Sequence, residues 1–266
     1  MIPYFQYNTI LVGPVSIQIW GLFVSLGLLS AILLAYHLAK KYLLSGEVIL
    51  DLAIWAIIGG LVGARIFHII FYEPVYYIQY PLDILKFWQG GASSLGGFIG
   101  AGLFVYFFVK TRKFSFKEIL PYIDIAVVSL WIGWGIGRLG CFMIHDHPGK
   151  LSDFFLAINF PFGARFDLGL IESMLAFALF IIHYSLFTKL IKIRWGLTAV
   201  FSFMGYAIAR FLLDFLRATD LPQSDARYFY LTPAQWGMGT LFIVLTVVLI
   251  CGIRVRNKNQ NENLKL

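Results

Sequence analysis

Seven long runs of apolar residues alternate with short polar segments along the chain. The runs cover about 17–37, 48–71, 92–110, 119–140, 168–188, 195–216 and 233–253. Each run is close to the roughly 20 residues that a helix needs to cross the hydrocarbon core of a bilayer. No series of short segments has the alternation that is typical of transmembrane β-barrel strands. The pattern therefore predicts an all-α, polytopic membrane protein with seven transmembrane helices.

Composition agrees with this assignment and leaves little of the chain outside the membrane. The 266 residues are 59% hydrophobic and 13% charged, and the mean hydropathy is +0.79. A soluble domain of this size could not bury so much apolar surface. We expect one seven-helix membrane domain with interfacial outer loops over residues 1–253, and a disordered, basic cytoplasmic tail over residues 254–266. The first residues lack a basic n-region, so we expect no cleavable signal peptide.

Basic residues in the connections sort to one side of the membrane. Thirteen of the 21 lysines and arginines follow the first, third and fifth runs or lie in the tail, whereas five lie in the other loops. By the positive-inside rule, the N-terminus is outside and the C-terminus is cytoplasmic. The net charge of +7 follows this sorting, so it does not indicate binding to nucleic acid. The aromatic loop 72–91 is expected to form a short interfacial helix.

Ionisable residues within the runs gather near the outer surface. Charged groups inside a membrane helix are costly, and they are candidate functional sites by default. In the predicted orientation Arg65, Arg138 and Glu172 each lie toward the outer end of a different helix. Arg210 and Asp214 lie at the same depth on the sixth helix, four residues apart, so that they can form a pair. Four helices therefore contribute to one polar region.

Two interpretations of this polar region are open. It can be a structural ion pair that makes a membrane arginine tolerable. It can also be an anion-binding site, because arginine binds phosphate through two parallel hydrogen bonds. Arg138 is expected at the depth of the lipid phosphates, and the most abundant anion there is the phospholipid headgroup. The second interpretation predicts a phospholipid substrate.

His145, Asp146 and His147 follow the fourth run directly and also suggest a metal site. Two histidines at i, i+2 with an aspartate between them lack the ligand number and the geometry of a clear zinc motif. From the sequence we therefore expect no metal ion and no cofactor.

Several motifs in order resemble the bacterial prolipoprotein diacylglyceryl transferase family. The segment "GRLGCFMIHDHPG" is similar to the family signature G-R-x-G-N-F-x-N-x-E-x-x-G. The segments "GPVSIQIWGLFVSLG", "GARIFHIIFY", "WQGGASSLGGFIGA", "FDLGLIESML", "ARFLLDFLR" and "LTPAQW" fall in the family's order. The resemblance covers nearly the whole chain, and it also fits seven spans with the N-terminus outside.

The resemblance implies an activity, a location and partners. These enzymes transfer the diacylglyceryl group of phosphatidylglycerol to the cysteine thiol of a prolipoprotein signal peptide, so that a thioether forms and glycerol phosphate leaves. The chain is then expected to be a multi-pass protein of the bacterial plasma (inner) membrane, with its active site toward the outer leaflet. Its expected partners are phosphatidylglycerol, the signal peptides of prolipoproteins and the lipid bilayer.

The resemblance also assigns roles to individual residues. Arg138 matches the signature arginine that binds the lipid phosphate, and Arg210 matches a second essential arginine. Gly149 matches the last signature glycine, and Arg65 is a further candidate for binding the lipid. Acidic residues stand where the family has acidic residues: Glu172, Asp214 and Asp146.

Three positions depart from the family pattern. Leu95 stands where the family often has histidine, Cys141 stands in place of the signature asparagine, and Trp20 stands in place of a tyrosine. Leu95 cannot accept a proton from the acceptor thiol. His145 or His147 could act instead, or a carboxylate could, or arginines alone could lower the pKa of the thiol. The alternative is a catalytically altered or inactive paralogue that binds anionic phospholipid.

Overall fold

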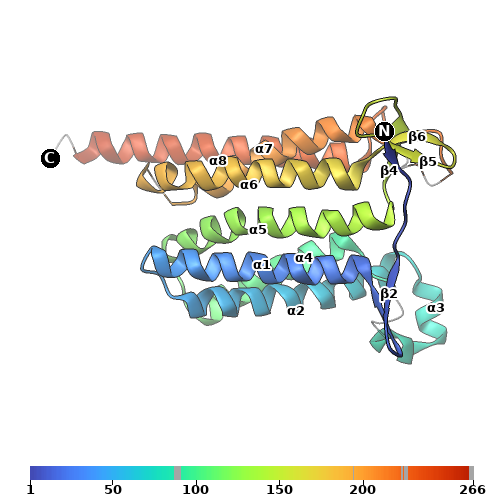
Figure 1. The fold of residues 1–266 in the computed structure, drawn as a ribbon. Helices are drawn as coiled ribbons and strands as arrows, with labels where there is room; N and C mark the ends of the chain where they lie inside the picture. The colour runs from blue at the N-terminus through green and yellow to red at the C-terminus, as the bar shows by residue number, and fades with distance from the viewer. Residues whose placement is uncertain (87–90, 194, 223, 225–226, 264–266) are drawn as a thin grey trace. The chain divides into compact units, whose positions relative to one another are not determined.

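The computed structural model describes residues 1–86, 91–193, 195–222, 224 and 227–263. Within these residues the chain is mostly helical (Figure 1). The helices of more than fifteen residues are α1 (Ile19–Lys41), α2 (Gly46–Phe71), α4 (Ser94–Thr111), α5 (Phe116–Ile144), α6 (Leu168–Ile193), α7 (Leu197–Leu213) and α8 (Pro233–Asn263).

These helices confirm a polytopic membrane protein. Six of them are long and apolar enough to cross a membrane, and α4 contains a shorter apolar stretch at Leu95–Thr111. Large apolar side chains on α8, among them Ile243 and Val247, are more than half exposed, as expected for a surface in contact with lipid. The number of spans and their orientation stay predictions. Because α8 continues to Asn263, the expectation of a wholly disordered tail is wrong for residues 254–263.

The chain divides into two compact units. One unit contains Met1–Leu33 and Ile123–Leu266, and the other contains Leu34–Tyr122. The division passes through α1 and α5, so each of these helices contributes residues to both units. The expectation of a single membrane domain over residues 1–253 stays a prediction.

Glycines bring α2 and α4 into close contact within the second unit. A side chain added at Gly100 would lie 2.8 Å from the Cα atom of Gly63, and one added at Gly63 would lie 2.7 Å from the Cα atom of Gly100. Small residues allow such close approach of helices in membranes. The segments "GGLVGAR" and "GGFIGAG" are thus explained by packing. After α2 the chain forms α3 (Pro74–Gln79) and the 3-10 helix η1 (Pro81–Leu85), so the predicted short helix in the loop 72–91 is present.

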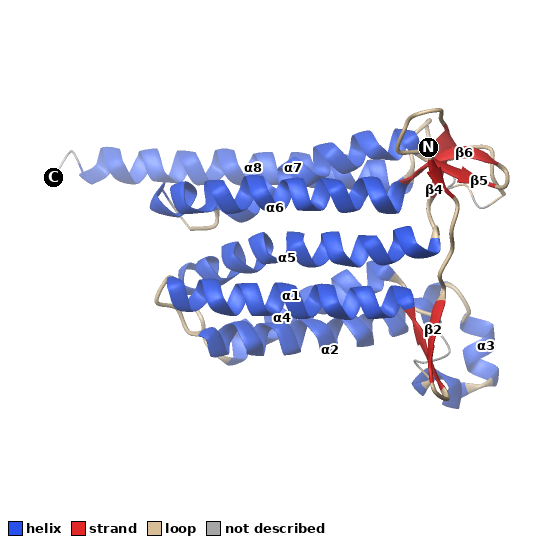
Figure 2. Cartoon of the chain, in the orientation of Figure 1, coloured by secondary structure: helices blue, strands red, loops and turns tan. Residues whose placement is uncertain are grey.

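The first unit contains a small sheet that the sequence did not predict. Its order is β1-β5-β6-β4, with a separate hairpin of β2 and β3 (Figure 2). The strands are β1 (Ile2–Pro3), β2 (Thr9–Val12), β3 (Val15–Gln18), β4 (Pro148–Leu151), β5 (Ile158–Phe160) and β6 (Gly163–Asp167). Strands of two to five residues are too short for a recognisable alternation. The segment between α5 and α6 is therefore ordered, and it fixes the residues that follow Ile144.

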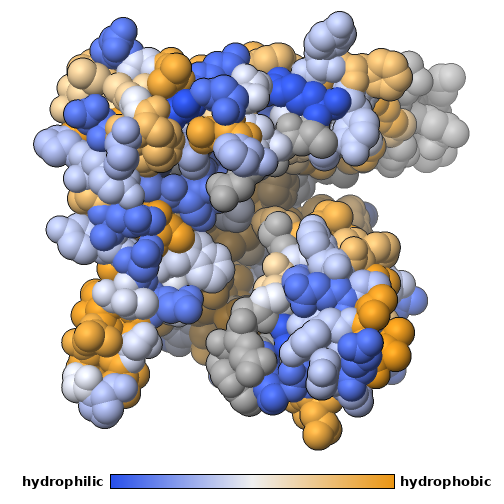
Figure 3. Space-filling view, turned by 90° about the vertical axis from the view of Figure 1, so that its right-hand side faces the viewer, coloured by the Kyte–Doolittle hydropathy of each residue, from blue (hydrophilic) through white to orange (hydrophobic). Residues whose placement is uncertain are grey.

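The surface at the helix ends that carry these strands contains polar and apolar side chains side by side (Figure 3). Figure 3 shows this face, with many hydrophilic side chains among the apolar ones. Such a surface is typical of the region where a membrane protein meets headgroups and water. The charged residues that the sequence singled out in α5, α6 and α7 lie toward the same ends of their helices.

Candidate functional site

Glu172 on α6 joins two arginines from neighbouring helices. The Nε atom of Arg138 on α5 lies 2.8 Å from one carboxylate oxygen, and Arg210 on α7 donates from Nη1 to the other. The Glu172 side chain is 1% exposed. A buried carboxylate needs such partners, because an unpaired charge in this environment is very costly. The structure thus brings together three side chains that are 34 to 72 positions apart in the sequence.

Asp214 extends this network on the far side of Arg210. It begins the 3-10 helix η3 (Asp214–Leu216) at the end of α7 and is fully buried. One of its oxygens lies 3.2 Å from Nη2 of Arg210 and 3.0 Å from Nε of Arg217. The hydroxyl of Thr232 donates to its other oxygen. The i, i+4 pair predicted for Arg210 and Asp214 is therefore part of a larger network.

Thr232 is held in place by a capping box at the start of α8. Its hydroxyl accepts a hydrogen bond from the backbone N–H of Gln235 at 3.1 Å, and the Gln235 side chain accepts one from the backbone of Thr232 at 3.0 Å. The amide of Gln235 also donates to the carbonyl of Phe211 at 3.1 Å. The segment "LTPAQW" therefore positions a donor to Asp214.

Among the described residues, the network contains more guanidinium groups than carboxylates. We call the five side chains the arginine cluster: Arg138, Glu172, Arg210, Asp214 and Arg217. Three guanidinium groups face two carboxylates, and both carboxylates are almost completely buried. Arg138 and Arg217 are the more accessible arginines, with side chains 17% and 19% exposed. A site with several guanidinium groups, each able to donate two parallel hydrogen bonds, suits an anionic group such as a phosphate.

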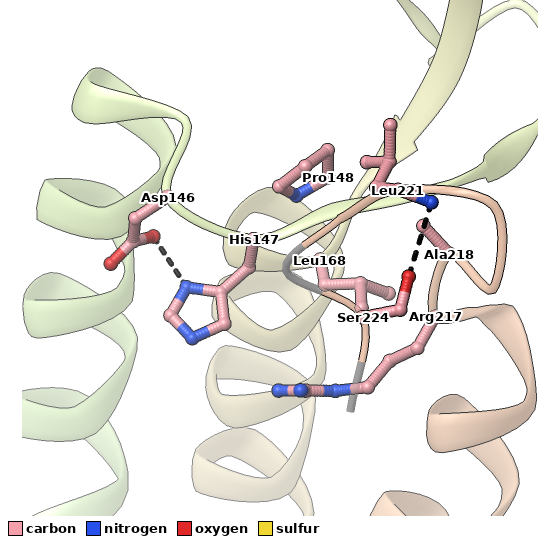
Figure 4. Close-up of a pocket in the computed structure, with 8 residues that line it drawn as sticks. All are labelled: Asp146, His147, Pro148, Leu168, Arg217, Ala218, Leu221 and Ser224. Carbon is pink, nitrogen blue, oxygen red and sulfur yellow. Dashed lines mark hydrogen bonds and ion pairs between the residues drawn. The ribbon is translucent and has the colours of Figure 1, made fainter. Parts of the chain in front are cut away.

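A pocket lies beside the cluster, and Arg217 belongs to both. The pocket has a volume of about 70 Å³, enough for a few water-sized groups. Figure 4 shows the Arg217 side chain extending across the pocket toward His147. The lining residues are Asp146, His147, Pro148, Leu168, Arg217, Ala218, Leu221 and Ser224. Through Arg217, the cluster therefore reaches a pocket that a small group could enter.

His147 is held in its charged form by its neighbours. Its Nδ1 atom hydrogen-bonds Asp146, and it also hydrogen-bonds Cys141. Burial disfavours the charge, but these hydrogen bonds and the negative charge of Asp146 outweigh it, and together they raise the pKa of His147 to about 9. At neutral pH the imidazole is then protonated, so it does not serve as a ready proton acceptor in this arrangement.

His145 lies away from the pocket, in an aromatic surrounding. Its side chain is 1% exposed, and Nδ1 lies 2.6 Å from Asp167. The rings of Tyr4, Phe5 and Phe160 pack around it with centroids 4.7 to 5.4 Å away. Among the described residues the structure records no hydrogen-bond partner for its Nε2 atom. His145 therefore holds the N-terminal segment against the end of α5, and its burial argues against contact with a substrate thiol.

Gly149 places the backbone next to Arg217. The two residues form an isolated β-bridge, and Arg165 donates to the Gly149 carbonyl at 3.1 Å. A side chain at this position would lie 2.7 Å from the carbonyl oxygen of Leu216. The last glycine of the signature-like segment is thus required for close backbone approach, which in turn positions Arg217.

Arg65 belongs to the other unit, and its side chain binds backbone carbonyl groups of that unit. Its guanidinium donates to the carbonyl oxygens of Ile84, Asp83 and Gly91 at 3.0, 2.5 and 3.0 Å, and it packs over the ring of Tyr77. The residue is 3% exposed. These contacts order the segment after α3. They give Arg65 a structural role that its position in the sequence did not indicate.

The sequence did not single out every residue that the structure places at the site. Arg217 follows Arg210 by seven residues, which predicts a helix face shared with Arg210 and Asp214, but it was not among the candidate site residues. Thr232 was not singled out, and Cys141 was singled out only as a departure from the signature. Cys141 is buried and lies 3.7 Å from Nη1 of Arg138. The ligand atoms of Cys141, Asp146 and His147 all lie within 4.8 Å of one another, so these three residues can hold a metal ion.

Comparison with known proteins gives consistent matches over almost the whole chain. A sequence model described as prolipoprotein diacylglyceryl transferase matches residues 8–253. A Pseudomonas aeruginosa protein named phosphatidylglycerol–prolipoprotein diacylglyceryl transferase is 34% identical over 245 residues, which are 90% of this chain and 87% of that protein. Proteins of the same name from Pseudomonas fluorescens and Pseudomonas putida are each 32% identical, covering 95% and 94% of this chain and 93% and 92% of their own lengths.

Proposed function

The chain belongs to the prolipoprotein diacylglyceryl transferase family, and from this premise we propose that it transfers the diacylglyceryl group of phosphatidylglycerol to a prolipoprotein cysteine. The acceptor is the lipobox cysteine of a signal peptide. Its thiolate sulfur attacks the glyceryl carbon that carries the phosphate ester. The carbon–oxygen bond breaks, and glycerol phosphate leaves with the electron pair while a thioether forms.

The arginine cluster is the observation that carries this proposal. Negative charge develops on the phosphate oxygen as the carbon–oxygen bond breaks, and donors fixed in a dry site stabilise such charge strongly. Arg138 and Arg217 are the more accessible guanidinium donors of the cluster. The phosphate of the lipid is thus bound where its leaving group needs stabilisation.

The two buried carboxylates act on the arginines rather than on the substrate. Glu172 forms ion pairs with Arg138 and Arg210, and Asp214 forms ion pairs with Arg210 and Arg217. Neither carboxylate is accessible to a thiol, because their side chains are 1% and 0% exposed. We therefore assign Glu172 and Asp214 to positioning the guanidinium groups.

Activation of the thiol depends on positive charge in this proposal. Leu95 has no proton acceptor, His145 is buried against Asp167, and Asp146 is hydrogen-bonded to His147. Positive charge beside a thiol lowers its pKa and increases the fraction of thiolate, which is the nucleophile. The guanidinium group of Arg217, which lines the pocket, acts in this sense.

The proposed location is the bacterial plasma membrane, with the site toward the outer leaflet and the C-terminus in the cytoplasm. The distribution of loop lysines and arginines supports it. Cysteines introduced by Lys113→Cys and Lys150→Cys, in a Cys251→Ser background, test it with a membrane-impermeant thiol reagent on intact cells. Labelling at position 150 and not at 113 is expected, and the reverse would overturn the orientation.

Complementation tests the function in the cell. Bacteria depleted of their own transferase should regain growth and lipoprotein maturation when they express this chain, and the Arg138→Ala variant should not restore them. If the wild-type chain inserts in the membrane and binds phosphatidylglycerol but does not restore maturation, it is a lipid-binding paralogue without this activity.

A further inference from the structure

Three side chains with metal-binding atoms meet where α5 ends. Cys141 lies in the last turn of α5, and Asp146 and His147 follow that helix after a change of direction. His145 has a φ of 52°, in the left-handed region, where the chain turns back on the helix end. The ligand atoms of Cys141, Asp146 and His147 come within 4.8 Å of one another as a result. The sequence spacing did not reveal this group, because Cys141 precedes the two others by most of two helical turns.

The donor set has the character of a zinc site. A thiolate sulfur, an imidazole nitrogen and a carboxylate oxygen are the three ligand types that zinc takes from proteins, at about 2.0 to 2.3 Å. Ligand atoms around one such ion lie roughly 3 to 4 Å apart, so small rotations of the three side chains suffice. A thiolate and a carboxylate also carry two negative charges, which balance a divalent cation.

The surroundings are compatible with this charge. The guanidinium group of Arg138 lies close to the three ligands, with Nη1 3.7 Å from the sulfur of Cys141. Its charge is already paired with Glu172, at 2.8 Å. An N–H group directed at a ligand sulfur is a common outer contact of metal-bound thiolates. Binding of the ion replaces the hydrogen bond between Asp146 and His147.

We propose that Cys141, Asp146 and His147 bind one Zn²⁺ ion, and that its fourth coordination position takes a thiol from the pocket. Two of the three ligands, Asp146 and His147, line the pocket beside the cluster. Three protein ligands with an open fourth position are the arrangement of zinc sites that bind substrate or water. A thiol that coordinates the ion is deprotonated outright. The part that concerns the thiol rests on the proposed function, whereas the metal site does not.

This site gives a physical reason for one departure from the family pattern. Cys141 supplies a thiolate ligand where the signature has asparagine, whose amide is a poor ligand for zinc.

Cobalt binding tests the site without reference to transfer. The full chain, purified in detergent without metal, is titrated with Co²⁺, which reports tetrahedral thiolate coordination by charge-transfer and d–d absorption. We expect one Co²⁺ per chain, displaced by Zn²⁺, in the wild type and in Cys251→Ser. In Cys141→Asn the thiolate band should disappear and the affinity should fall at least 10-fold, as it should in His147→Gln. A Cys141→Asn protein that keeps the band, or a wild type without it, overturns the proposal.

Two further measurements show whether a variant has lost metal binding, its folded structure or its transfer activity. Thermal unfolding without metal should be similar in Cys141→Asn and wild type, and Zn²⁺ should raise the midpoint only in the wild type. A lipobox peptide should intensify the Co²⁺ thiolate band, whereas the same peptide with serine for cysteine should not. Transfer that persists with no Co²⁺ binding overturns the metal site and leaves the proposed function intact. Co²⁺ binding without transfer supports the site and contradicts the function.

Discussion

Glu172 binds Arg138 with one carboxylate oxygen and Arg210 with the other, so a single buried side chain sets the spacing of two guanidinium groups. The contact to Nε of Arg138 is 2.8 Å, and that to Arg210 is a direct hydrogen bond from Nη1. Three helices, α5, α6 and α7, meet at this carboxylate. Its charge therefore contributes both to the packing of the helices and to the geometry of the proposed phosphate site.

Replacing Glu172 with glutamine keeps the shape and removes the charge. Two arginines then lose their common partner, and breaking a buried pair costs about 3–5 kcal/mol. We expect a clearly lower unfolding temperature in detergent and a loss of transfer activity. Glu73, whose side chain is 54% exposed, provides the control. Glu73→Gln should change stability by no more than about 0.5 kcal/mol, and an equal effect of both variants would contradict the role of Glu172.

Arg138→Lys tests whether the geometry of the guanidinium matters beyond its charge. Lysine keeps the positive charge but cannot donate two parallel hydrogen bonds to a phosphate. We expect the turnover rate to fall roughly 100-fold, the scale for loss of one fixed donor to a developing anion. Arg112, an exposed residue paired with Asp51 at 2.9 Å, gives the matched control. Full turnover in Arg138→Lys with unchanged lipid affinity would refute direct phosphate binding.

Arg217 is the cluster residue that lines the pocket, and its sequence position predicts a helix face shared with Arg210 and Asp214. Arg217→Gln removes one positive charge beside the pocket while Arg138 and Arg210 keep their partner Glu172. We expect weaker binding of phosphatidylglycerol, seen as an increase in KM of at least 10-fold, with a smaller effect on stability. The control is Arg227→Gln, where the guanidinium donates to the Tyr230 carbonyl at 3.3 Å and belongs to neither the cluster nor the pocket lining. If both variants behave as the wild type, Arg217 has no part in binding.

Gly149→Ala tests the close approach of two backbone segments. The added methyl group would lie 2.7 Å from the carbonyl oxygen of Leu216, so β4 and the segment that carries Arg217 must separate. We expect a loss of about 1–3 kcal/mol in stability and reduced activity. Gly237→Ala on α8 has no atom within 4 Å and should be neutral or slightly stabilising. Circular dichroism melting of both proteins in the same detergent makes the comparison.

The sequence predicted the helices and most of the cluster for a clear reason. Apolar runs of about 20 residues and charged groups within them are signals that a single chain carries locally. Arg138, Glu172 and Arg210 were therefore predicted to share a site from their similar depth in the membrane, and the structure brings their side chains into contact. Their mutual contacts required the packing of three helices, which no local pattern encodes.

Other features depended on contacts that the sequence does not display. Arg65 was grouped with the site by depth, yet its guanidinium binds backbone carbonyls of the segment after α3. His145 was a candidate base by proximity, yet it is buried against Asp167. The short strands between α5 and α6 gave no alternation to detect, although they place Gly149 beside Arg217.

The most direct test of the account is transfer by the purified chain in vesicles that contain phosphatidylglycerol labelled in its headgroup. With a lipobox peptide present, we predict release of labelled glycerol phosphate together with a peptide that has gained one diacylglyceryl group. Release should stop when serine replaces the peptide cysteine, and the Arg138→Ala variant should be inactive. Release that is independent of the peptide, or a wild-type chain that binds the lipid and releases nothing, would contradict the account.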